Sequence, residues 1–319
     1  MTKIICGVDV ASDSLQARID CDGPERCFSQ TSQGITELAD FCRQHHVELV
    51  AMEATGGYEK QAFSQLWALG LPVAILNPRA VRRFAEGMGL LEKTDRIDAG
   101  VIAWFAQVKR CAPCTPASAQ QEHLHALVTR LRQLTELQTM QRNQRLLVTD
   151  PTVLDSFTQI LALIAAQIRT LAAAISKLIS ADPLWQQLDQ AFRSIKGVAD
   201  RTVARLMAEM PEIGTLSNKA ISKLAGLAPL ARDSGSFQGK RPVRGGRAEV
   251  RAILFVVASV VRRHDPDFTA FDRRLTAAGK PKKVIRVALA HKLLVRLNAK
   301  ARQVRSQFQE TAFAVLLHS

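Results

Sequence analysis

The chain has 319 residues, of which 47% are hydrophobic and 23% are charged, so it is long enough for two globular domains and a connector. Its formal net charge is +14. No wholly apolar or small run is longer than Ala252–Val261, and the first residues lack the regions of a signal peptide, which argues against a membrane or secreted protein. We therefore expect a cytoplasmic protein with no membrane partner.

The positive charge is concentrated in the carboxy-terminal part of the chain. Residues 191–319 hold 25 Lys and Arg against 9 Asp and Glu, whereas residues 1–190 hold 18 against 20. A basic portion of this size is the usual electrostatic footprint of a polyanion partner. A merely solubilising surface usually mixes both signs, so we favour nucleic acid as the partner.

The first hundred residues alternate strand-like and helix-like runs, separated by Gly, Pro, Ser and Asp turn signals. Strands are expected over residues 3–10, 15–21, 26–29, 48–52 and 72–76. Helices are expected over residues 36–45 and 59–68, and a third one begins at Asn77-Pro78. Three meandering strands followed by alternating helices and strands predict a mixed α/β sheet covered by helices, in which ligand-binding groups gather at strand ends.

Four acidic residues mark this part of the chain. Asp9 and Glu53 each end an apolar strand-like run, and Asp95 and Asp98 lie three residues apart at a helix start, where they share one face. Such carboxylates could hold two divalent cations such as Mg²⁺, which stabilise the attacking and leaving oxygens of a phosphoryl transfer. Taken singly, each acid also has a structural explanation, for instance a turn after Asp9 or a helix N-cap at Asp95.

Residues 111–118 are predicted to be a linker. They include Cys111 and Cys114, which are spaced like half of a zinc site but are followed by no second pair of ligands. We interpret both as ordinary linker cysteines. The six cysteines of the chain show no disulfide-framework spacing, which is typical of a reducing compartment.

Two long helices are predicted next, over residues 118–148 and after Asp150-Pro151, and both carry apolar stripes. The first stripe consists of Leu124, Leu127, Leu131 and Leu134. The second consists of Phe157, Leu161, Ile164, Ile168, Leu171, Ile175 and Leu178. Spacings that alternate between four and three predict a coiled-coil seam. Either a hairpin that pairs with itself or an arm that pairs with a second chain fits this pattern.

Beyond Trp185 the pattern is mostly helical and basic. Residues 194–199 resemble the turn of a helix-hairpin-helix, in which Gly197 permits a close backbone approach and Lys196 is a candidate nucleic-acid contact. Ala199 replaces the second Gly that such turns often have, so an ordinary helix–helix turn is the alternative.

A glycine-rich basic segment, residues 231–247, is the second candidate site. Its guanidinium groups could bind phosphates, because Arg offers planar bidentate donors. The candidate contacts are Arg232, Lys240, Arg241, Arg244 and Arg247. Ser234 and Ser236 are candidate nucleophiles, although no His stands nearby in sequence to activate a hydroxyl. The alternative is a flexible basic loop whose serines form turns.

Short motifs in both halves together resemble the DEDD-type insertion-sequence transposases, a family that includes a related pilin-gene invertase. The amino-terminal motifs are Gly7-Val-Asp9, Glu53-Ala-Thr-Gly-Gly-Tyr58, Asn77-Pro78 and Lys93-Thr-Asp-Arg-Ile-Asp-Ala99. The carboxy-terminal motifs are Leu224-Ala-Gly-Leu-Ala-Pro229 and Asp233-Ser-Gly-Ser236. The resemblance covers nearly the whole chain, and the shared order of these motifs makes it specific.

The resemblance implies a ribonuclease-H-like, RuvC-type domain in residues 1–115 that holds Mg²⁺ through Asp9, Glu53, Asp95 and Asp98. It also implies a mostly helical domain in residues 186–319, and the apolar stripes predict a coiled-coil helical connector in residues 116–185 between the two. In that last domain the residue matching the family's nucleophile is Ser234, with Ser236 as the fallback. Similar proteins use a structured guide RNA that pairs with donor and target DNA, and they assemble as dimers and tetramers with an active site shared between protomers.

The expected function is therefore a Mg²⁺-dependent DNA transposase of an insertion sequence, acting through a serine nucleophile and guided by a structured RNA. Three alternatives remain open from the sequence. They are a site-specific DNA invertase, a junction-resolving nuclease in which water attacks, and a nucleic-acid-binding protein without catalysis.

Overall fold

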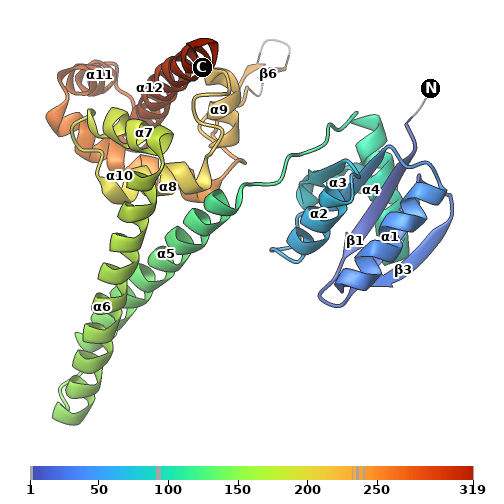
Figure 1. Ribbon diagram of the computed structural model, residues 1–319. Coiled ribbons are helices and arrows are strands. Elements are labelled where there is room, and N and C mark those ends of the chain that lie inside the picture. Colours follow the sequence, from blue (N-terminus) through green and yellow to red (C-terminus); the bar gives the residue numbers. More distant parts are fainter. Residues whose placement is uncertain (1–2, 91–94, 232, 235–236, 240, 319) are drawn as a thin grey trace. The chain divides into compact units, whose positions relative to one another are not determined.

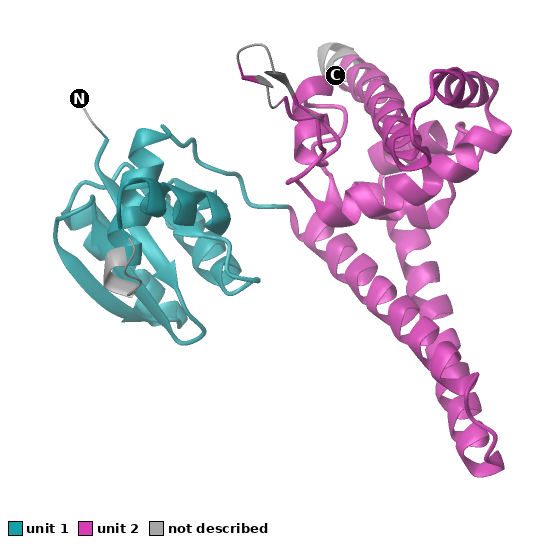
Figure 2. Cartoon of the chain, turned by 180° about the vertical axis from the view of Figure 1, so that it is seen from behind, with its two compact units in different colours: residues 1–117 teal, residues 118–319 magenta. Residues whose placement is uncertain are grey.

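The computed structural model describes residues 3–90, 95–231, 233–234, 237–239 and 241–318. The chain divides into two compact units, residues 1–117 and residues 118–319 (Figure 2). Residues 111–118, which join the units, form neither helix nor strand. Domain limits were expected at residues 115 and 185, and the helical connector between them is here part of the second unit.

Unit 1 is built on a five-stranded sheet with the order β3-β2-β1-β4-β5. The strands are β1 (Ile5–Val10), β2 (Ser14–Ile19), β3 (Glu25–Ser29), β4 (Leu49–Glu53) and β5 (Val73–Leu76). Strand β2 pairs antiparallel with β1 and β3, whereas β1, β4 and β5 run parallel to one another. This order, an antiparallel meander extended by parallel strands, is that of a ribonuclease-H-like domain and confirms the predicted fold class.

Helices cover both faces of this sheet (Figure 1). Helices α1 (Ser32–Gln44) and α2 (Glu59–Ala68) pack on one face, where Cys6, Val8 and Val10 of β1 point. Helices α3 (Pro78–Gly87) and α4 (Asp95–Val108) pack on the other face, where Ile5 of β1 points. Because side chains alternate along a strand, Gly7 and Asp9 also face α4.

Capping residues determine where helices α1 and α3 of unit 1 begin. The Asn77 side chain accepts hydrogen bonds from the first backbone N–H groups of α3, and Pro78 occupies its first turn. Helix α1 begins at Ser32, four residues before the predicted start at residue 36. The reason is that the Thr31 hydroxyl caps α1 by accepting from Gly34 N at 3.2 Å, and the polar first turn lacks the apolar period used for prediction.

Unit 2 begins with a long helical hairpin, formed by α5 (Ala119–Arg145) and α6 (Pro151–Ala181) (Figure 1). A short turn joins the two helices, so they pack antiparallel. Leu124, Leu131 and Leu134 of α5 are buried, as are Ile164, Ile168 and Ile175 of α6. These residues belong to the two predicted stripes, so the predicted seam is confirmed as a contact within the chain.

By length and composition alone, α6 could cross a membrane, and no other helix in the described part of the chain could. A single helix of this kind is weak evidence, because core helices of soluble proteins pass the same test. Helix α6 packs along α5 and also contacts α7 (Pro183–Arg193) and α8 (Asp200–Glu209), so part of its apolar surface is used within unit 2.

The rest of unit 2 is a helical body around one core. Its further helices are α9 (Asn218–Leu224), α10 (Ala248–His264), α11 (Pro266–Ala277) and α12 (Lys282–His318). Phe192, Leu206, Leu254 and Leu293 are buried in this core. Between α9 and α10 lie two strands of two residues each, β6 (Asp233–Ser234) and β7 (Phe237–Gln238), which the sequence pattern did not predict.

Candidate active site

Two of the four predicted acidic residues lie side by side in unit 1. Strands β1 and β4 are parallel neighbours with Val8 opposite Met52, so Asp9 and Glu53, one residue further on, lie on adjacent strands. Each lies two residues after a position on the α4 face, Gly7 in β1 and Ala51 in β4, and both are half-buried. Neighbouring strands are about 4.8 Å apart, so the two carboxylates leave the same face of the sheet at the same level.

Helix α4 brings the third acid to this face. A Cβ added at Gly7 would overlap the Ala99 carbonyl oxygen and would lie 2.6 Å from Ala103 N, so α4 lies directly on the β1 backbone. Asp98 precedes Ala99 and is half-buried. Asp95 is the first residue of α4, and its side chain lies outside the described residues. Asp98 therefore lies near the start of the helix that crosses β1, and Asp9 and Glu53 lie on the sheet face that this helix covers.

The contact at Gly7 gives a testable expectation. Gly7→Ala should destabilise unit 1 by about 1–3 kcal/mol, because the added methyl group must push α4 away from β1. Equilibrium unfolding in urea would measure the loss. Gly87→Ala in α3 is the matched control, since a Cβ there meets nothing within 4 Å and the φ of Gly87 is not positive. Equal stability of the Gly7→Ala and Gly87→Ala proteins would contradict the close packing.

The donor types at this site suit a hard cation, because Mg²⁺ prefers carboxylate oxygens and retains several waters. Nevertheless, among the residues that the structure describes, no three His, Cys, Asp or Glu side chains are grouped closely enough to hold a metal ion. Asp9 and Glu53 supply two oxygen donors on one face, and Asp98 stands on the adjoining helix. The predicted four-carboxylate metal site therefore stays a prediction, since among the described residues only Asp9 and Glu53 are shown to share one face of the sheet.

The segment that follows Glu53 is held by a residue not singled out in the sequence. The Glu59 carboxylate accepts hydrogen bonds from Thr55 N at 3.0 Å and from Gly57 N at 2.8 Å. Gly56 and Gly57 have φ values of +71° and +116°, which L side chains rarely adopt. The Gly-Gly pair followed by Glu at a helix start was the signal for this turn, which keeps the chain beside Glu53 in one conformation.

The loop of unit 2 that carries Ser234 is called the serine loop here, and two glycines close it at its base. Gly226 and Gly246 have φ values of +65° and +62°, and a Cβ on either one would overlap the backbone of the opposite segment. Arg247 N also donates to Leu224 O at 2.7 Å. The two ends of the loop, residues 224–226 and 245–247, are therefore packed backbone against backbone.

Within this loop Ser234 is exposed and lies on β6, opposite Phe237 of β7. Arg241 and Arg244 are exposed on the return segment. Three other predicted residues, Arg232, Ser236 and Lys240, lie outside the described residues. The loop therefore presents the predicted nucleophile on a short hairpin followed by exposed cations.

Arg247 has a different environment from the other predicted phosphate contacts. Its guanidinium group donates to both carboxylate oxygens of Glu212, at 2.6 Å each, and to Glu209 O at 2.8 Å. Burial raises the pKa of Glu212, but the hydrogen bonds from Arg247 outweigh it and leave the pKa below its ordinary value. Arg247 thus ties the loop base to the segment after α8.

This ion pair predicts a pH dependence of stability. Because the pKa of Glu212 is lower in the folded state, the pair stabilises the protein above the ordinary carboxyl pKa and loses that effect as pH falls through the folded-state pKa. Glu212→Gln should therefore reduce the free energy of unfolding at neutral pH by about 1–2 kcal/mol after solvent screening, with the difference shrinking below about pH 4.5. Urea unfolding at several pH values would measure this, and a pH-independent difference would contradict it.

Lys196 lies in the turn between α7 and α8 and is exposed. Gly197 in this turn has a φ of +99°, and a Cβ there would come within 3.1 Å of Val261 N. Gly197 thus lets the turn pack closely on α10, and a phosphate contact from this turn stays a prediction. In the first turn of α8, Asp200 is already paired with Arg193 at 2.7 Å, so that helix start has an anionic neighbour from the chain itself.

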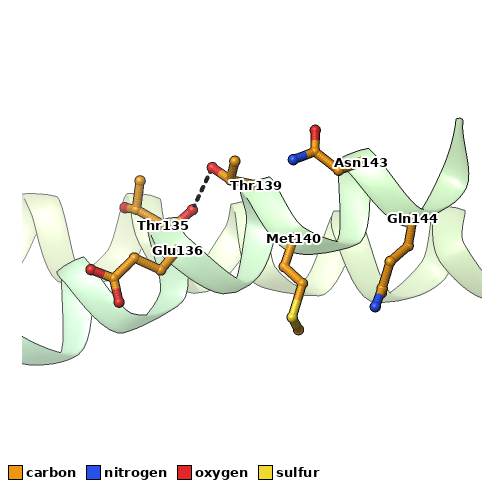
Figure 3. Close-up of a pocket in the computed structure, with 6 residues that line it drawn as sticks. All are labelled: Thr135, Glu136, Thr139, Met140, Asn143 and Gln144. Atoms are coloured by element: carbon orange, nitrogen blue, oxygen red, sulfur yellow. Dashed lines mark hydrogen bonds between the residues drawn. The ribbon is translucent and has the colours of Figure 1, made fainter.

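One pocket of about 510 Å³ in unit 2 is lined by none of the predicted site residues. All of its lining residues come from α5, and they include Thr135, Glu136 and Thr139 (Figure 3). The Thr139 hydroxyl donates to Thr135 O at 3.0 Å, and Glu136 pairs with Arg132. With its one carboxylate already paired, this pocket presents no converging reactive groups.

Two models of known protein families match this chain. Residues 6–148 match a family model described as "Transposase", and residues 189–273 match one described as "Transposase IS116/IS110/IS902 family". The pilin gene-inverting protein of Moraxella lacunata is 30% identical over 328 aligned residues, which cover 96% of this chain and 98% of that protein. The chain belongs to the IS110/IS116 family of transposases.

Two further proteins and one solved structure are similar to this chain. The pilin gene-inverting protein of Moraxella bovis matches with the same identity and coverage. An uncharacterised insertion element IS110 protein of Streptomyces coelicolor is 31% identical over 130 residues, 40% of this chain and 31% of that protein. The solved Thermus thermophilus RuvC structure aligns with 35% of this chain and 99% of its own, at 15% identity and a TM-score of 0.26.

Proposed function

We propose that this transposase-family protein is a Mg²⁺-dependent DNA recombinase that cuts and rejoins strands through Ser234. The observation that supports this most directly is the position of Asp9 and Glu53 on neighbouring strands of one sheet face, with Asp98 on the helix that covers it. Folding alone would favour apolar residues at the ends of two buried strands, so carboxylates there indicate chemistry.

Asp9, Glu53, Asp95 and Asp98 would hold the metal ions through their carboxylate oxygens. Bound Mg²⁺ would stabilise the negative charge that develops on a phosphodiester under attack. By holding the ions at one place on the sheet face, the four acids would determine where the scissile phosphate binds. The fixed turn after Glu53 would keep that carboxylate in place while DNA binds.

Ser234 would act as the nucleophile. Its Oγ would form a bond to the phosphorus as the bond to the 3′ oxygen breaks. A phosphoserine link and a free 3′-hydroxyl would result, with the serine proton passing to the 3′ oxygen directly or through water. A 3′-hydroxyl of another strand would then attack the link and restore the serine. The exposure of Ser234 on a hairpin supports this role, because a nucleophile must reach the strand.

Cations of the loop would hold the DNA backbone around Ser234. Arg232, Lys240, Arg241 and Arg244 are proposed as phosphate contacts, and Lys196 as a contact from the α7–α8 turn. Arg247 is proposed as a positioning residue instead, because its donors are used by Glu212 and Glu209. Its removal would shift the loop rather than remove a phosphate contact.

The proposed partners are donor and target DNA, a structured guide RNA and further copies of the chain, all in the cytoplasm. The basic carboxy-terminal part supports a nucleic-acid partner. At the hairpin end Leu146 and Leu147 are 81% and 89% exposed, which supports an apolar contact with a second copy. Light scattering that finds only monomers at micromolar concentration would refute the oligomer, and purification without any discrete RNA species would refute the guide.

The function itself can be tested with purified protein and supercoiled DNA that carries the ends of the element. The proposal predicts Mg²⁺-dependent cleavage and strand joining, with protein covalently bound to DNA in denaturing gels. Cleavage without a protein–DNA adduct would favour a junction-resolving nuclease. Binding without cleavage at any metal concentration would favour a non-catalytic nucleic-acid-binding protein.

A second candidate function, site-specific DNA inversion, is favoured by the similarity to the pilin gene-inverting proteins over 96% of the chain. The chemistry would be the same, and the arrangement of the DNA sites would decide the product. Plasmids with the two sites in opposite orientation would distinguish them, because an invertase flips the intervening DNA whereas a transposase excises or inserts the element.

A further inference from the structure

A second strongly basic region lies in unit 2, in a pocket of about 850 Å³ between α10, α11 and the start of α12. Five cationic side chains line it. They are Arg262 from α10, Lys280 from the turn after α11, and Lys282, Lys283 and Arg286 from α12. None of these residues belongs to the serine loop or to the acidic site of unit 1.

Among the residues that the structure describes, carboxylates neutralise only a small part of this positive charge. The one carboxylate that lines the pocket, Asp272, is bonded to Arg262 at 2.8 Å. Lys280, Lys282 and Lys283 are exposed, and within the described part of the chain none of them has a carboxylate at ion-pair distance. Arg286 lies over the Phe255 ring at 5.3 Å, which holds its guanidinium group at the pocket wall.

The start of α12 carries positive charges, which are unfavourable at the positive N-terminal end of a helix dipole. Helix N-termini favour acidic residues. The first turns of α5, α8, α10 and α11 contain Glu122, Asp200, Glu249 and Asp267, whereas those of α1, α3, α6, α7 and α9 contain none. The first turn of α12 contains no acid and begins with Lys282 and Lys283. Arg286 lies one turn further along the same face, so these cations also repel one another.

Such an arrangement disfavours the helix unless an anion offsets it. The buried Ile285 anchors the first turn in the core, which keeps the exposed cations in place around the pocket. Local charge choices that oppose the fold are expected mainly at functional sites. The cations come from α10, from the turn after α11 and from α12. Because they are spread around an open pocket, they suit an extended polyanion better than a small anion.

We propose that this pocket binds the phosphodiester backbone of a nucleic-acid strand. The proposal rests on the nucleic-acid binding in the proposed function but not on its metal ions or on Ser234. The shared chemistry is the phosphate backbone, which either duplex DNA or structured RNA supplies. The pocket would therefore add a phosphate contact away from the serine loop.

The test measures the affinity of the full-length protein for duplex DNA and for double-stranded RNA of the same sequence at increasing KCl. In such a series the logarithm of the affinity falls linearly with the logarithm of salt, with a slope of about 0.9 per phosphate contact on B-DNA. The double variant Lys282→Ala/Lys283→Ala should lose about two units of slope and about tenfold or more in affinity at moderate salt for the nucleic acid that binds there.

A matched control removes the same charge elsewhere in unit 2. Arg169 and Lys177 are exposed on α6, outside the pocket, so Arg169→Ala/Lys177→Ala should leave the salt slope nearly unchanged. Lys280→Ala is a second pocket variant that lies before α12 and cannot disturb the helix, and it should lose about one unit of slope. Thermal unfolding of the double variant should be unchanged or higher, because like charges at the helix start are removed.

The outcomes are distinct. A reduced slope with DNA alone assigns the pocket to DNA, and a reduced slope with RNA alone assigns it to RNA. If both pocket variants keep the wild-type slope on both duplexes, the pocket proposal is overturned while nucleic-acid binding stands. If the wild-type protein binds neither duplex, the nucleic-acid part of the proposed function fails, and the pocket proposal fails with it.

Discussion

Ser234→Ala is expected to abolish covalent protein–DNA adducts and to reduce strand joining by roughly a thousandfold or more, the scale for loss of a covalent nucleophile. The reason is that no phosphoserine link can form without the Oγ atom. Ser234 is exposed, so its replacement should not disturb the core. Denaturing gels with radiolabelled DNA would measure the adduct, and a filter-binding assay should give unchanged affinity.

Ser236→Ala is the matched control, since it removes the same hydroxyl two residues away. We expect this variant to form adducts at the normal yield. Adducts that persist in Ser234→Ala but vanish in Ser236→Ala would transfer the role to Ser236. Normal adduct formation in both variants, and in the double variant, would exclude a serine of this loop from the chemistry.

Asp9→Asn should reduce Mg²⁺-dependent cleavage by about a hundredfold to a thousandfold, the usual effect of removing one group that stabilises charge in the transition state. The amide keeps the shape of the side chain but loses the negative charge that a hard cation requires. Nucleic-acid binding should be retained, because the proposed phosphate contacts lie in unit 2. Cleavage rates at increasing Mg²⁺ would measure the loss.

Asp13→Asn provides the control for this substitution. Asp13 is exposed in the turn between β1 and β2, so it has the same chemistry near the same strand but outside the α4 face. Its replacement should leave cleavage within about twofold of the wild type, as expected for a surface residue away from the site. Wild-type cleavage by Asp9→Asn at every Mg²⁺ concentration would remove Asp9 from the metal site.

Much of the fold could be predicted from short-range patterns. The strands of unit 1 alternate or run apolar between clear turn signals, so their order along the chain and their approximate limits followed from the sequence. The hairpin helices were predictable because Leu131 and Ile168 belong to stripes with a regular period. Asp9 and Glu53 were predicted as carboxylates that end apolar runs, and the parallel pairing of β1 with β4 in the structure places them on one face.

The remaining features depend on contacts between distant segments. Glu212 lies 35 residues before Arg247, and nothing in the basic loop indicates which of its cations makes that ion pair. The two-residue strands β6 and β7 are too short for a period to be recognised. Lys282 and Lys283 look like ordinary surface charge until α10 and α11 are packed around them.

The backbone contact between Gly226 and Gly246 separates the serine loop from the helices that carry it. Because the two ends of the loop are packed together there and Leu227 is buried in the core, the exposed residues Ser234, Arg241 and Arg244 can be replaced without disturbing that core. Such an insert can change in length and composition without endangering its scaffold. Related proteins could therefore acquire new DNA preferences through changes in this loop alone. The loop could also be transplanted between relatives at the same two glycines.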